Sequence, residues 1–164
     1  MNAREPENPR PVTLVTGAMG CIGAWVLYHL VRQGRRAVSF DLSQDRHRLN
    51  LLLTPEEQAE VEFLHGDLTD PAQVMAAIRD HQVNRIVHLA ALQVPFCREN
   101  PVLGARVNVV GTVNVFEAAR ACGVRHLAYA SSVAVYGPPV LERRAEVMQE
   151  APYEPATLYG VYKV

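Results

Sequence analysis

Two side chains near the end of the sequence could together move a proton. Tyr159 and Lys163 are four positions apart, so a helix would place them on one face, one turn apart. Lys163 is the one lysine among the sixteen Lys and Arg residues of the chain. An ammonium group near a phenol favours the phenolate, which can exchange a proton with a hydroxyl or carbonyl group. A surface Tyr–Lys pair without a function would show the same spacing, so the pair alone leaves both interpretations open.

Two serines could assist the tyrosine. The run "RHLAYASS" predicts a short strand, and Ser131 and Ser132 stand at its carboxyl end. A hydroxyl group at that edge could hold the same oxygen atom that Tyr159 protonates, although Ser132 could equally be a simple strand cap. His88 ends another predicted strand and is interpreted as a hydrogen-bonded core residue. The sequence shows no Ser/His/Asp triad and no cluster of metal ligands.

A glycine-rich stretch near the start predicts a phosphate-binding turn. The stretch "TGAMGCIG" follows the apolar run "PVTLVT" and opens a segment with helical periodicity. A position between a strand and a helix is the context in which such glycines indicate a phosphate-binding turn. Gly17 allows a tight turn, Gly20 lets a pyrophosphate approach the backbone, and Gly23 lets the helix pack against the sheet. The amides at the start of the helix would then face the phosphates. A turn needed only for packing is the alternative.

Acidic residues after the next two predicted strands indicate the rest of a dinucleotide site. Asp41 ends the second strand, at the sequence separation from the glycines that is usual for the ribose-binding carboxylate of a dinucleotide site. A carboxylate there accepts the ribose hydroxyls of NAD and repels the 2′-phosphate of NADP. A helix cap is the alternative for Asp41, and Arg46 and Arg48 keep NADP open as a cofactor. The stretch "HGDLTD" places Asp67 and Leu68 either beside an adenine ring or in an ordinary turn.

Predicted strands and helices alternate along the chain. The strands are "PVTLVT", "RAVSFD", "VEFLHGD", "NRIVHLAA" and "RHLAYASS". Helices are predicted for 21–34, for a short segment within 42–53, for 70–81 with Asp70 as its cap, and for 101–121, and a surface loop is predicted for 137–155. This alternation indicates an α/β fold, a doubly wound parallel sheet of the Rossmann type with five strands. We expect a flexible tail at 1–10 and one domain at 11–164.

Composition excludes several classes of partner. The formal net charge is −1, so the chain has no large positive field to hold nucleic acid or an anionic membrane. The three cysteines are far apart and lack CxxC spacing, which is typical of reduced thiols in a cytosolic protein. The start of the chain lacks an apolar signal-peptide core, and the longest apolar run is too short to span a bilayer. We therefore predict a cytoplasmic location.

Taken together, the motifs resemble the extended short-chain dehydrogenase/reductase family, in particular its NAD-dependent epimerase/dehydratase group. The resemblance extends from Pro11 to Lys163 through "TGAMGCIG", Asp41, "GDLTD", "HLAA", "NVVGT", "SSVAVYG" and "YGVYK". It implies NAD as cofactor and a catalytic triad of Ser132, Tyr159 and Lys163. The cofactor contacts that we expect from the motifs and the resemblance are Gly17, Gly20, Ile22, Gly23, Asp41, Asp67, Leu68, Leu89, Ala90, Ala91, Asn108, Tyr159 and Lys163.

The resemblance also implies a reaction class. We expect chemistry on a nucleotide-sugar, with epimerisation of the UDP-glucose 4-epimerase kind as the first choice and dehydration or sugar dehydrogenation as alternatives. A non-catalytic NAD-binding module is the alternative from another class. The sequence departs from the usual pattern at Cys21, where an aromatic residue is common, at Tyr162, where a small hydroxyl residue is common, and at Gln93, where UDP-galactose 4-epimerases usually carry lysine. The complete protein is expected to be a homodimer.

The position at which the sequence ends is a further departure. Members of this family continue for well over a hundred residues, with outer strands and a smaller substrate domain that are not seen here. We therefore expect a truncated chain that binds NAD weakly and turns over no nucleotide-sugar. The fifth strand would form an unpaired edge, and Lys163, on the last turn of a frayed terminus, would not be held in place.

Overall fold

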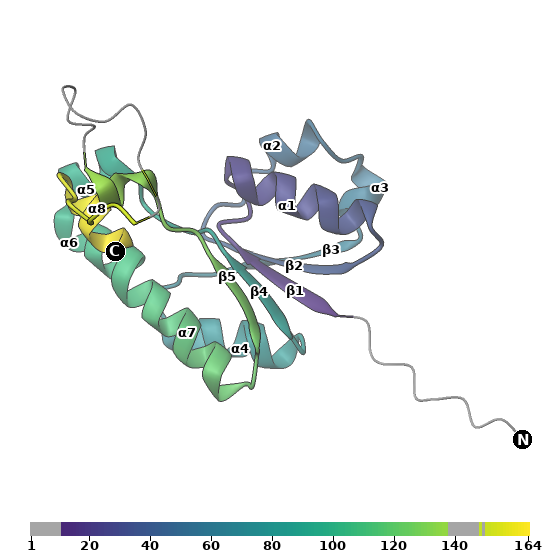
Figure 1. Ribbon diagram of the computed structural model, residues 1–164. Coiled ribbons are helices and arrows are strands. Elements are labelled where there is room, and N and C mark those ends of the chain that lie inside the picture. Colours follow the sequence, from purple (N-terminus) through teal and green to yellow (C-terminus); the bar gives the residue numbers. More distant parts are fainter. Residues whose placement is uncertain (1–10, 138–147, 149) are drawn as a thin grey trace, which may run out of the picture.

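The computed structural model describes residues 11–137, 148 and 150–164, and in this part of the chain five parallel strands form one sheet (Figure 1). The sheet order is β3-β2-β1-β4-β5. The strands are β1 (Val12–Thr16), β2 (Arg36–Asp41), β3 (Val61–His65), β4 (Arg85–His88) and β5 (His126–Tyr129). The predicted α/β fold and all five predicted strands are confirmed. The predicted tail at 1–10 and most of the predicted loop at 137–155 lie outside the described residues.

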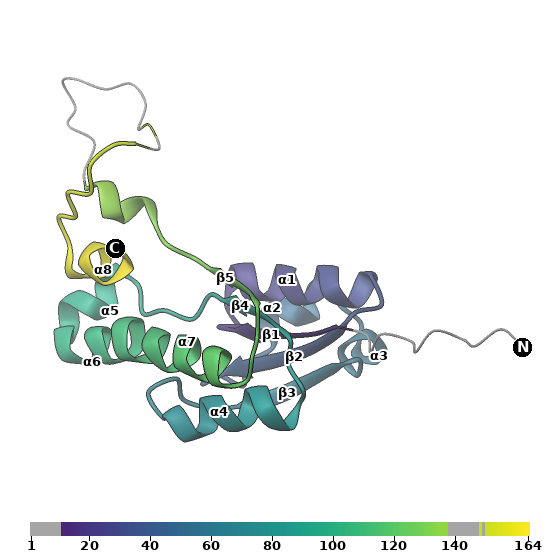
Figure 2. The same cartoon turned by 60° about the horizontal axis from the view of Figure 1, so that its bottom comes forward.

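Helices cover both faces of the sheet, as the doubly wound prediction requires. Figure 2 shows α1 on one face and α4 and α7 on the other. The longer helices are α1 (Cys21–Arg32), α4 (Pro71–Asp80) and α7 (Gly111–Ala121). The shorter ones are α2 (His47–Asn50), α3 (Pro55–Gln58), α5 (Val94–Glu99), α6 (Pro101–Ala105), the π-helix η1 (Arg106–Val110), the 3₁₀ helix η2 (Val133–Tyr136) and α8 (Leu158–Lys163).

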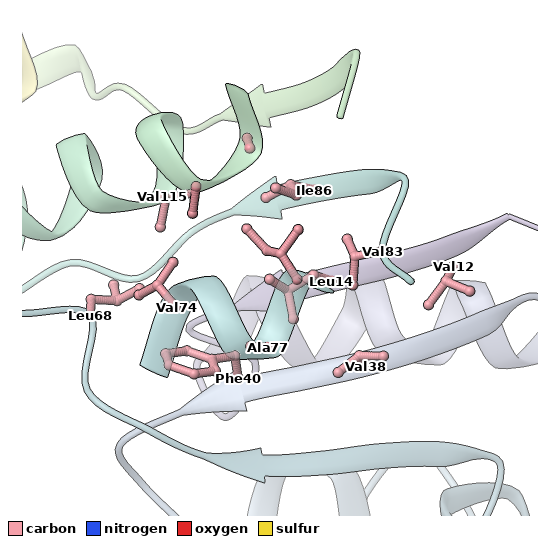
Figure 3. Packing of buried hydrophobic residues seen from close by; sticks show 13 residues of the cluster. Val12, Leu14, Val38, Phe40, Leu68, Val74, Ala77, Val83, Ile86 and Val115 are labelled. Carbon is pink, nitrogen blue, oxygen red and sulfur yellow. The ribbon is translucent and has the colours of Figure 1, made fainter. Parts of the chain in front are cut away.

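Two apolar layers hold the helices to the sheet. Strand β1 lies in the centre of the sheet and all five of its residues are buried. Figure 3 shows the layer under α4 and α7, where Leu14, Phe40, Ile86 and Val115 come together from three strands and one helix. Burying a side chain such as Leu14 or Ile86 contributes roughly 1.5–3 kcal/mol. A second layer packs α1 against the opposite face, around Leu27.

The predicted helices agree with the structure, but the short helices α3 and α5 were not predicted. Asp70 caps α4 as predicted, because its Oδ1 accepts the amides of Ala72 and Gln73 at 2.9 and 3.3 Å. The helix predicted for 101–121 has the predicted bounds, because α6, η1 and α7 follow one another without a gap, and α5, which was not predicted, precedes it. Asn100 explains the break before α6, since its Oδ1 accepts the amide of Leu103 at 3.0 Å and its backbone is not helical. The short helix predicted within 42–53 is observed as α2.

Strand β5 forms one edge of the sheet. Among the described residues it pairs only with β4, from Arg85 opposite His126 to His88 opposite Tyr129. The predicted edge position of the fifth strand is thus confirmed.

Candidate functional site

A cavity of about 550 Å³ opens above the carboxyl ends of the strands. It lies where the chain reverses its direction across the sheet, since β2 and β3 lie to one side of β1 and β4 and β5 to the other. Such switch points are the usual ligand sites of open α/β sheets, and the volume is typical of a cofactor site. The wall includes the glycine-rich turn, the ends of β2 and β3, residues 89–93, Ala130, Ser131, Tyr159 and Lys163.

The glycine-rich turn lets backbone form the wall of the cavity. Gly17 has φ +68°, and a Cβ atom there would lie 2.6 Å from the Ala90 nitrogen. A Cβ on Gly23 would overlap the Gly17 oxygen, so the first turn of α1 packs directly on the loop. Gly20 is the N-cap of α1 and supplies no side-chain cap. Gly17, Gly20, Ile22 and Gly23 all line the cavity, so uncapped helix amides are available to an anion there.

Asp41 joins the end of β2 to the glycine-rich turn. Its Oδ2 accepts the Met19 amide at 2.8 Å and its Oδ1 accepts the Ser43 amide at 2.8 Å. The carboxylate therefore braces two backbone segments of the cavity wall and does not cap a helix. Of the two arginines that kept NADP open, Arg48 lines the cavity and donates to the Met19 oxygen at 3.3 Å. The Arg46 guanidinium instead lies 3.6 Å from the ring centre of Phe63.

The turn after β3 supplies the neighbouring wall. Asp67 and Leu68 both line the cavity, together with Gly66. Asp67 Oδ1 accepts the Thr69 amide at 2.8 Å, which shapes the turn. Leu68 is buried, and its oxygen accepts a hydrogen bond from the Asn114 side chain on α7 at 2.8 Å. This wall therefore combines one carboxylate with one apolar side chain.

Residues 89–92 form the floor of the cavity and are anchored at both ends. Thr16 Oγ1 accepts the amides of Leu89 and Ala90 at 3.2 and 3.3 Å. At the other end, Asn108 Oδ1 accepts the Leu92 amide at 2.7 Å and Asn108 Nδ2 donates to the Leu92 oxygen at 2.8 Å. Leu89, Ala90 and Ala91 line the cavity, whereas Asn108 is buried behind it. Asn108 is thus placed to support the floor from η1.

A buried histidine connects these two anchors. His88 Nδ1 lies 2.6 Å from Thr16 Oγ1, and His88 Nε2 lies 3.0 Å from Thr112 Oγ1. Thr112 donates its own proton to the Asn108 oxygen at 2.7 Å. Nε2 of His88 must therefore donate to Thr112, and Nδ1 must accept from Thr16. Burial, followed by the positive charge of Lys163, lowers the pKa of His88 to about 4, so the ring is neutral at pH 7 and serves the core, as the sequence suggested.

The predicted Tyr–Lys pair lies on α8, the helix that closes the cavity opposite the glycine-rich turn. Thr157 begins this helix and its Oγ1 accepts the Gly160 amide at 3.0 Å. Tyr159 and Lys163 both line the cavity. The spacing of four therefore brings the phenol and the amine to one cavity with the glycine-rich turn.

Lys163 is held firmly, so the expectation that it would be loose is wrong. The side chain is 4% exposed, its Nζ donates to the Ala130 oxygen at 2.8 Å, and Nζ lies 4.6 Å from the ring centre of Tyr129. Ser131 Oγ donates to the Lys163 backbone oxygen at 3.0 Å. These contacts join α8 to residues more than thirty positions earlier. Burial lowers the pKa of the Lys163 amine.

The structure does not bring Ser132 into the cavity wall. Ser132 is half-buried, and its Oγ accepts the Ala134 amide at 3.2 Å, which caps η2. Its neighbour Ser131 lines the cavity instead. Sequence reasoning assigned no contact to several other residues of the wall, and most of these are direct neighbours of predicted residues. They are Met19, Cys21, Phe40, Leu42, Ser43, Gly66, Leu92, Val107 and Ala130.

Two other kinds of feature are absent from the described residues. No helix of residues 11–137 and 150–164 is both long and apolar enough to cross a membrane. In the same part of the chain, no three or more His, Cys, Asp or Glu side chains are grouped as metal ligands.

Comparison with known proteins places this geometry in a family. The model of the NAD dependent epimerase/dehydratase family matches residues 13–164. The UDP-glucose 4-epimerase of Mycolicibacterium smegmatis is 37% identical over 154 residues, which are 93% of this chain and 48% of that protein.

Solved structures of relatives have the same fold as this chain. The UDP-glucose 4-epimerase of Thermus thermophilus in complex with NAD has a TM-score of 0.79 at 32% identity, covering 93% of this chain and 47% of that one. The Stenotrophomonas maltophila UDP-glucose 4-epimerase with bound NAD and formylated UDP-arabinopyranose has a TM-score of 0.81 at 26% identity, covering 94% and 45%. The chain spans less than half the length of each of these three relatives. Through the family match over nearly all of its length, this chain belongs to the NAD-dependent epimerase/dehydratase family.

Proposed function

We propose that residues 11–164 are the cofactor domain of an enzyme and that their cavity binds NAD. One observation carries this proposal: a single cavity joins the uncapped start of α1 to the Tyr159–Lys163 pair. The residues fit the cofactor, because the glycine-rich turn lines the cavity and the start of α1 has no side-chain cap. The structures of relatives that contain NAD support the same assignment.

Each part of the cavity has a proposed role in holding NAD. The amides at the start of α1 bind the pyrophosphate, and Asp41 accepts the adenosine ribose hydroxyls. Asp67 and Leu68 border the adenine, and the floor at Leu89, Ala90 and Ala91 supports the middle of the cofactor. Asn108 keeps that floor in place through Leu92. Tyr159 and Lys163 lie at the nicotinamide end.

We propose that the complete protein acts on a nucleotide-sugar, with epimerisation as the reaction. Bound NAD supplies an acceptor for a hydride, which it can return to the substrate. Tyr159 exchanges the proton of the sugar hydroxyl that is oxidised, and Lys163 stabilises negative charge on the phenol oxygen. From the resemblance to the family we keep Ser132 as the residue that holds the reacting oxygen, which requires its hydroxyl to leave the Ala134 amide. Epimerisation is preferred to dehydration or dehydrogenation because the relatives named above are UDP-glucose 4-epimerases.

The length of the chain favours a second proposal for these 164 residues taken alone. Because they span less than half of the relatives, we propose that this segment binds NAD without turning over a nucleotide-sugar. Calorimetric titration with NAD and an epimerase assay on UDP-glucose test both statements together. Robust turnover would contradict the second.

Replacing Asp41 tests the cofactor assignment itself. Asp41→Ala removes a carboxylate that also braces Met19 and Ser43, so NAD affinity should fall about tenfold or more, the value of about one charge-assisted hydrogen bond. Asp45→Ala, a change at an exposed residue outside the cavity wall, is the matched control. Undiminished affinity in the Asp41 variant would remove the NAD assignment.

We also propose that the complete protein forms a homodimer in the cytoplasm. Val102, Val109, Val113 and Phe116 are exposed apolar residues along α6, η1 and α7, and a second copy of the same stripe would cover them. The three cysteines are free, which suits a reducing compartment. Analytical sedimentation of the chain tests the dimer. Val113→Glu should convert the dimer into a monomer. A wild-type chain that sediments as a monomer would contradict the assignment of the interface to this stripe.

A further inference from the structure

Lys163 carries a buried positive charge without a charged partner in the described structure. The side chain is 4% exposed. None of the ion pairs formed by Asp or Glu among residues 11–137, 148 and 150–164 includes it. A buried ammonium group that lacks compensation is strongly unfavourable. Something else in the structure must therefore keep this amine in place.

Two neutral groups at the end of β5 surround the amine. The Ala130 oxygen accepts a hydrogen bond from Nζ at 2.8 Å. The ring of Tyr129 lies under the same atom, with Nζ 4.6 Å from the ring centre. An aromatic face attracts a cation within about 6 Å, and the attraction increases when water is excluded. The ring thus supplies the electrostatic contact that a carboxylate would supply elsewhere.

The Tyr129 ring is itself held by the core. It stacks on His88 with ring centres 5.4 Å apart and planes inclined by 21°, and it meets Phe116 edge-on at 5.8 Å. His88 is in turn fixed by Thr16 and Thr112. The ring therefore has little freedom to turn away from the amine. A fixed ring orientation is what a cation-binding contact requires.

We propose that Tyr129 is a positioning residue, whose ring together with the Ala130 carbonyl holds the Lys163 ammonium at the cavity wall. The proposal rests on the proposed function, which gives Lys163 its role towards NAD and Tyr159. Simple apolar packing of Tyr129 is the competing explanation. The two differ in what the ring face contributes, because leucine can replace apolar volume but not the attraction of an aromatic face for a cation.

Other titratable groups surround the amine and must be considered in any test. Tyr159 and Tyr162 lie on the same helix, Tyr129 lies on β5, and His88 lies on β4, where the charge of Lys163 contributes to the lowered pKa of the ring. The helices packed against α8 carry two uncharged titratable side chains, Tyr136 and Cys97. They also carry three exposed charged residues, Arg98, Glu99 and Arg106. At pH 7 none of the neutral groups named here adds a positive charge beside Lys163.

The single lysine makes the test direct, because a chain labelled with ¹³C,¹⁵N-lysine gives one side-chain signal. In the wild-type chain without NAD, the protons next to Nζ should resonate upfield of free lysine, since they lie over an aromatic face. Tyr129→Leu should abolish this shift and lower the pKa of Lys163 by about one unit. Tyr129→Phe, which keeps the ring, should restore both values. Unshifted protons in the wild-type chain would overturn the proposal even if the leucine variant fails to fold.

NAD titrations of the same variants separate this proposal from the proposed function. Tyr129→Leu should weaken NAD binding about fivefold, and Tyr129→Phe less than about twofold, because phenylalanine keeps the ring face that attracts the cation. An unchanged affinity in the leucine variant, with the pKa lowered, would contradict the positioning role. NAD could also bind to the wild-type chain without altering the Lys163 signal. That result would contradict the proposed role of Lys163 towards NAD, whereas the contact between Lys163 and the Tyr129 ring, observed without NAD, would stand.

Discussion

The two ends of the cavity are built in different ways. The end at Gly17 is made of backbone, lies beside the central strand β1 and is braced by Asp41 and by Thr16. The end at Lys163 is made of side chains on α8, next to β5, which is the edge strand of the sheet among the described residues. Backbone beside the central strand is held by strands on both sides, whereas α8 is held by packing against the short helices α5, α6, η1 and η2. The first end should therefore unfold with the whole domain and the second end more locally.

The largest expected effect comes from adding one methyl group at the backbone-built end. Gly17→Ala places a side chain in a left-handed conformation and 2.6 Å from the Ala90 nitrogen, so the free energy of unfolding should fall by roughly 3 kcal/mol. NAD binding should be lost with it. Gly34→Ala is the matched control, because Gly34 has φ +61° and open space around it, so only about 1 kcal/mol should be lost. Denaturant unfolding measures both, and equal losses would show that the contact with Ala90 is unimportant.

Acid should weaken the core that joins the two ends. The pKa of His88 is about 4 in the folded chain against an ordinary value of 6.5, so between these values the unfolded chain binds the additional proton. Stability is then complete above pH 6.5 and decreases as the pH falls towards 4, by roughly 3 kcal/mol in total. Unfolding curves from about pH 7 to about pH 4 measure this slope.

A matched pair of variants assigns that slope to one ring. His88→Asn should remove this contribution to the slope, at a cost in stability at pH 7, because Thr16 and Thr112 lose their shared partner. His126→Asn, at an exposed position of β5, should leave the slope as it is. A slope that survives in the His88 variant would show that another group titrates.

At the side-chain-built end, stability and binding should change in opposite directions. Lys163→Met removes a buried amine whose pKa is lowered by burial, so the free energy of unfolding should rise by about 1 kcal/mol while NAD affinity falls about tenfold. Arg106→Met, at an exposed residue of η1, should alter neither quantity. A Lys163 variant that binds NAD as tightly as the wild-type chain would mean that this end takes no part in the site.

The smallest expected effect concerns how independently α8 opens. Thr157→Ala removes the cap of α8, which is worth about 1 kcal/mol locally, so amide exchange within α8 should accelerate about fivefold while global unfolding changes little. Asp70→Ala removes the corresponding cap of α4 and should lower the global free energy of unfolding by about 1 kcal/mol. If both variants lost the same global stability, the two ends would unfold as one unit.

The same contrast explains what could be predicted from the sequence. The strands and the Gly17 turn follow from local rules, namely apolar runs, glycine spacing and the cap at Asp70, and they agree with the structure. The position of the Lys163 side chain depends on contacts with Ala130 and Tyr129, which are more than thirty residues away in the sequence. No local sequence pattern indicates such contacts. The choice between Ser131 and Ser132 at the cavity wall likewise depends on how η2 turns after β5.

The π-helix η1 also limits how this chain can change its length. Successive residues of an α-helix are rotated by about 100°, and a π-helical turn accommodates one residue more than an α-helical turn. Deleting a single residue between Arg106 and Val110 can therefore convert the π-helical turn into an α-helical turn, which leaves the two halves of the long helix in register. The same deletion within α7, which has no additional residue, would rotate one half of that helix by about 100° relative to the other, and Val115 would leave the core. The turn at η1 is consequently the position along this helix where the loss of one residue should be tolerated best.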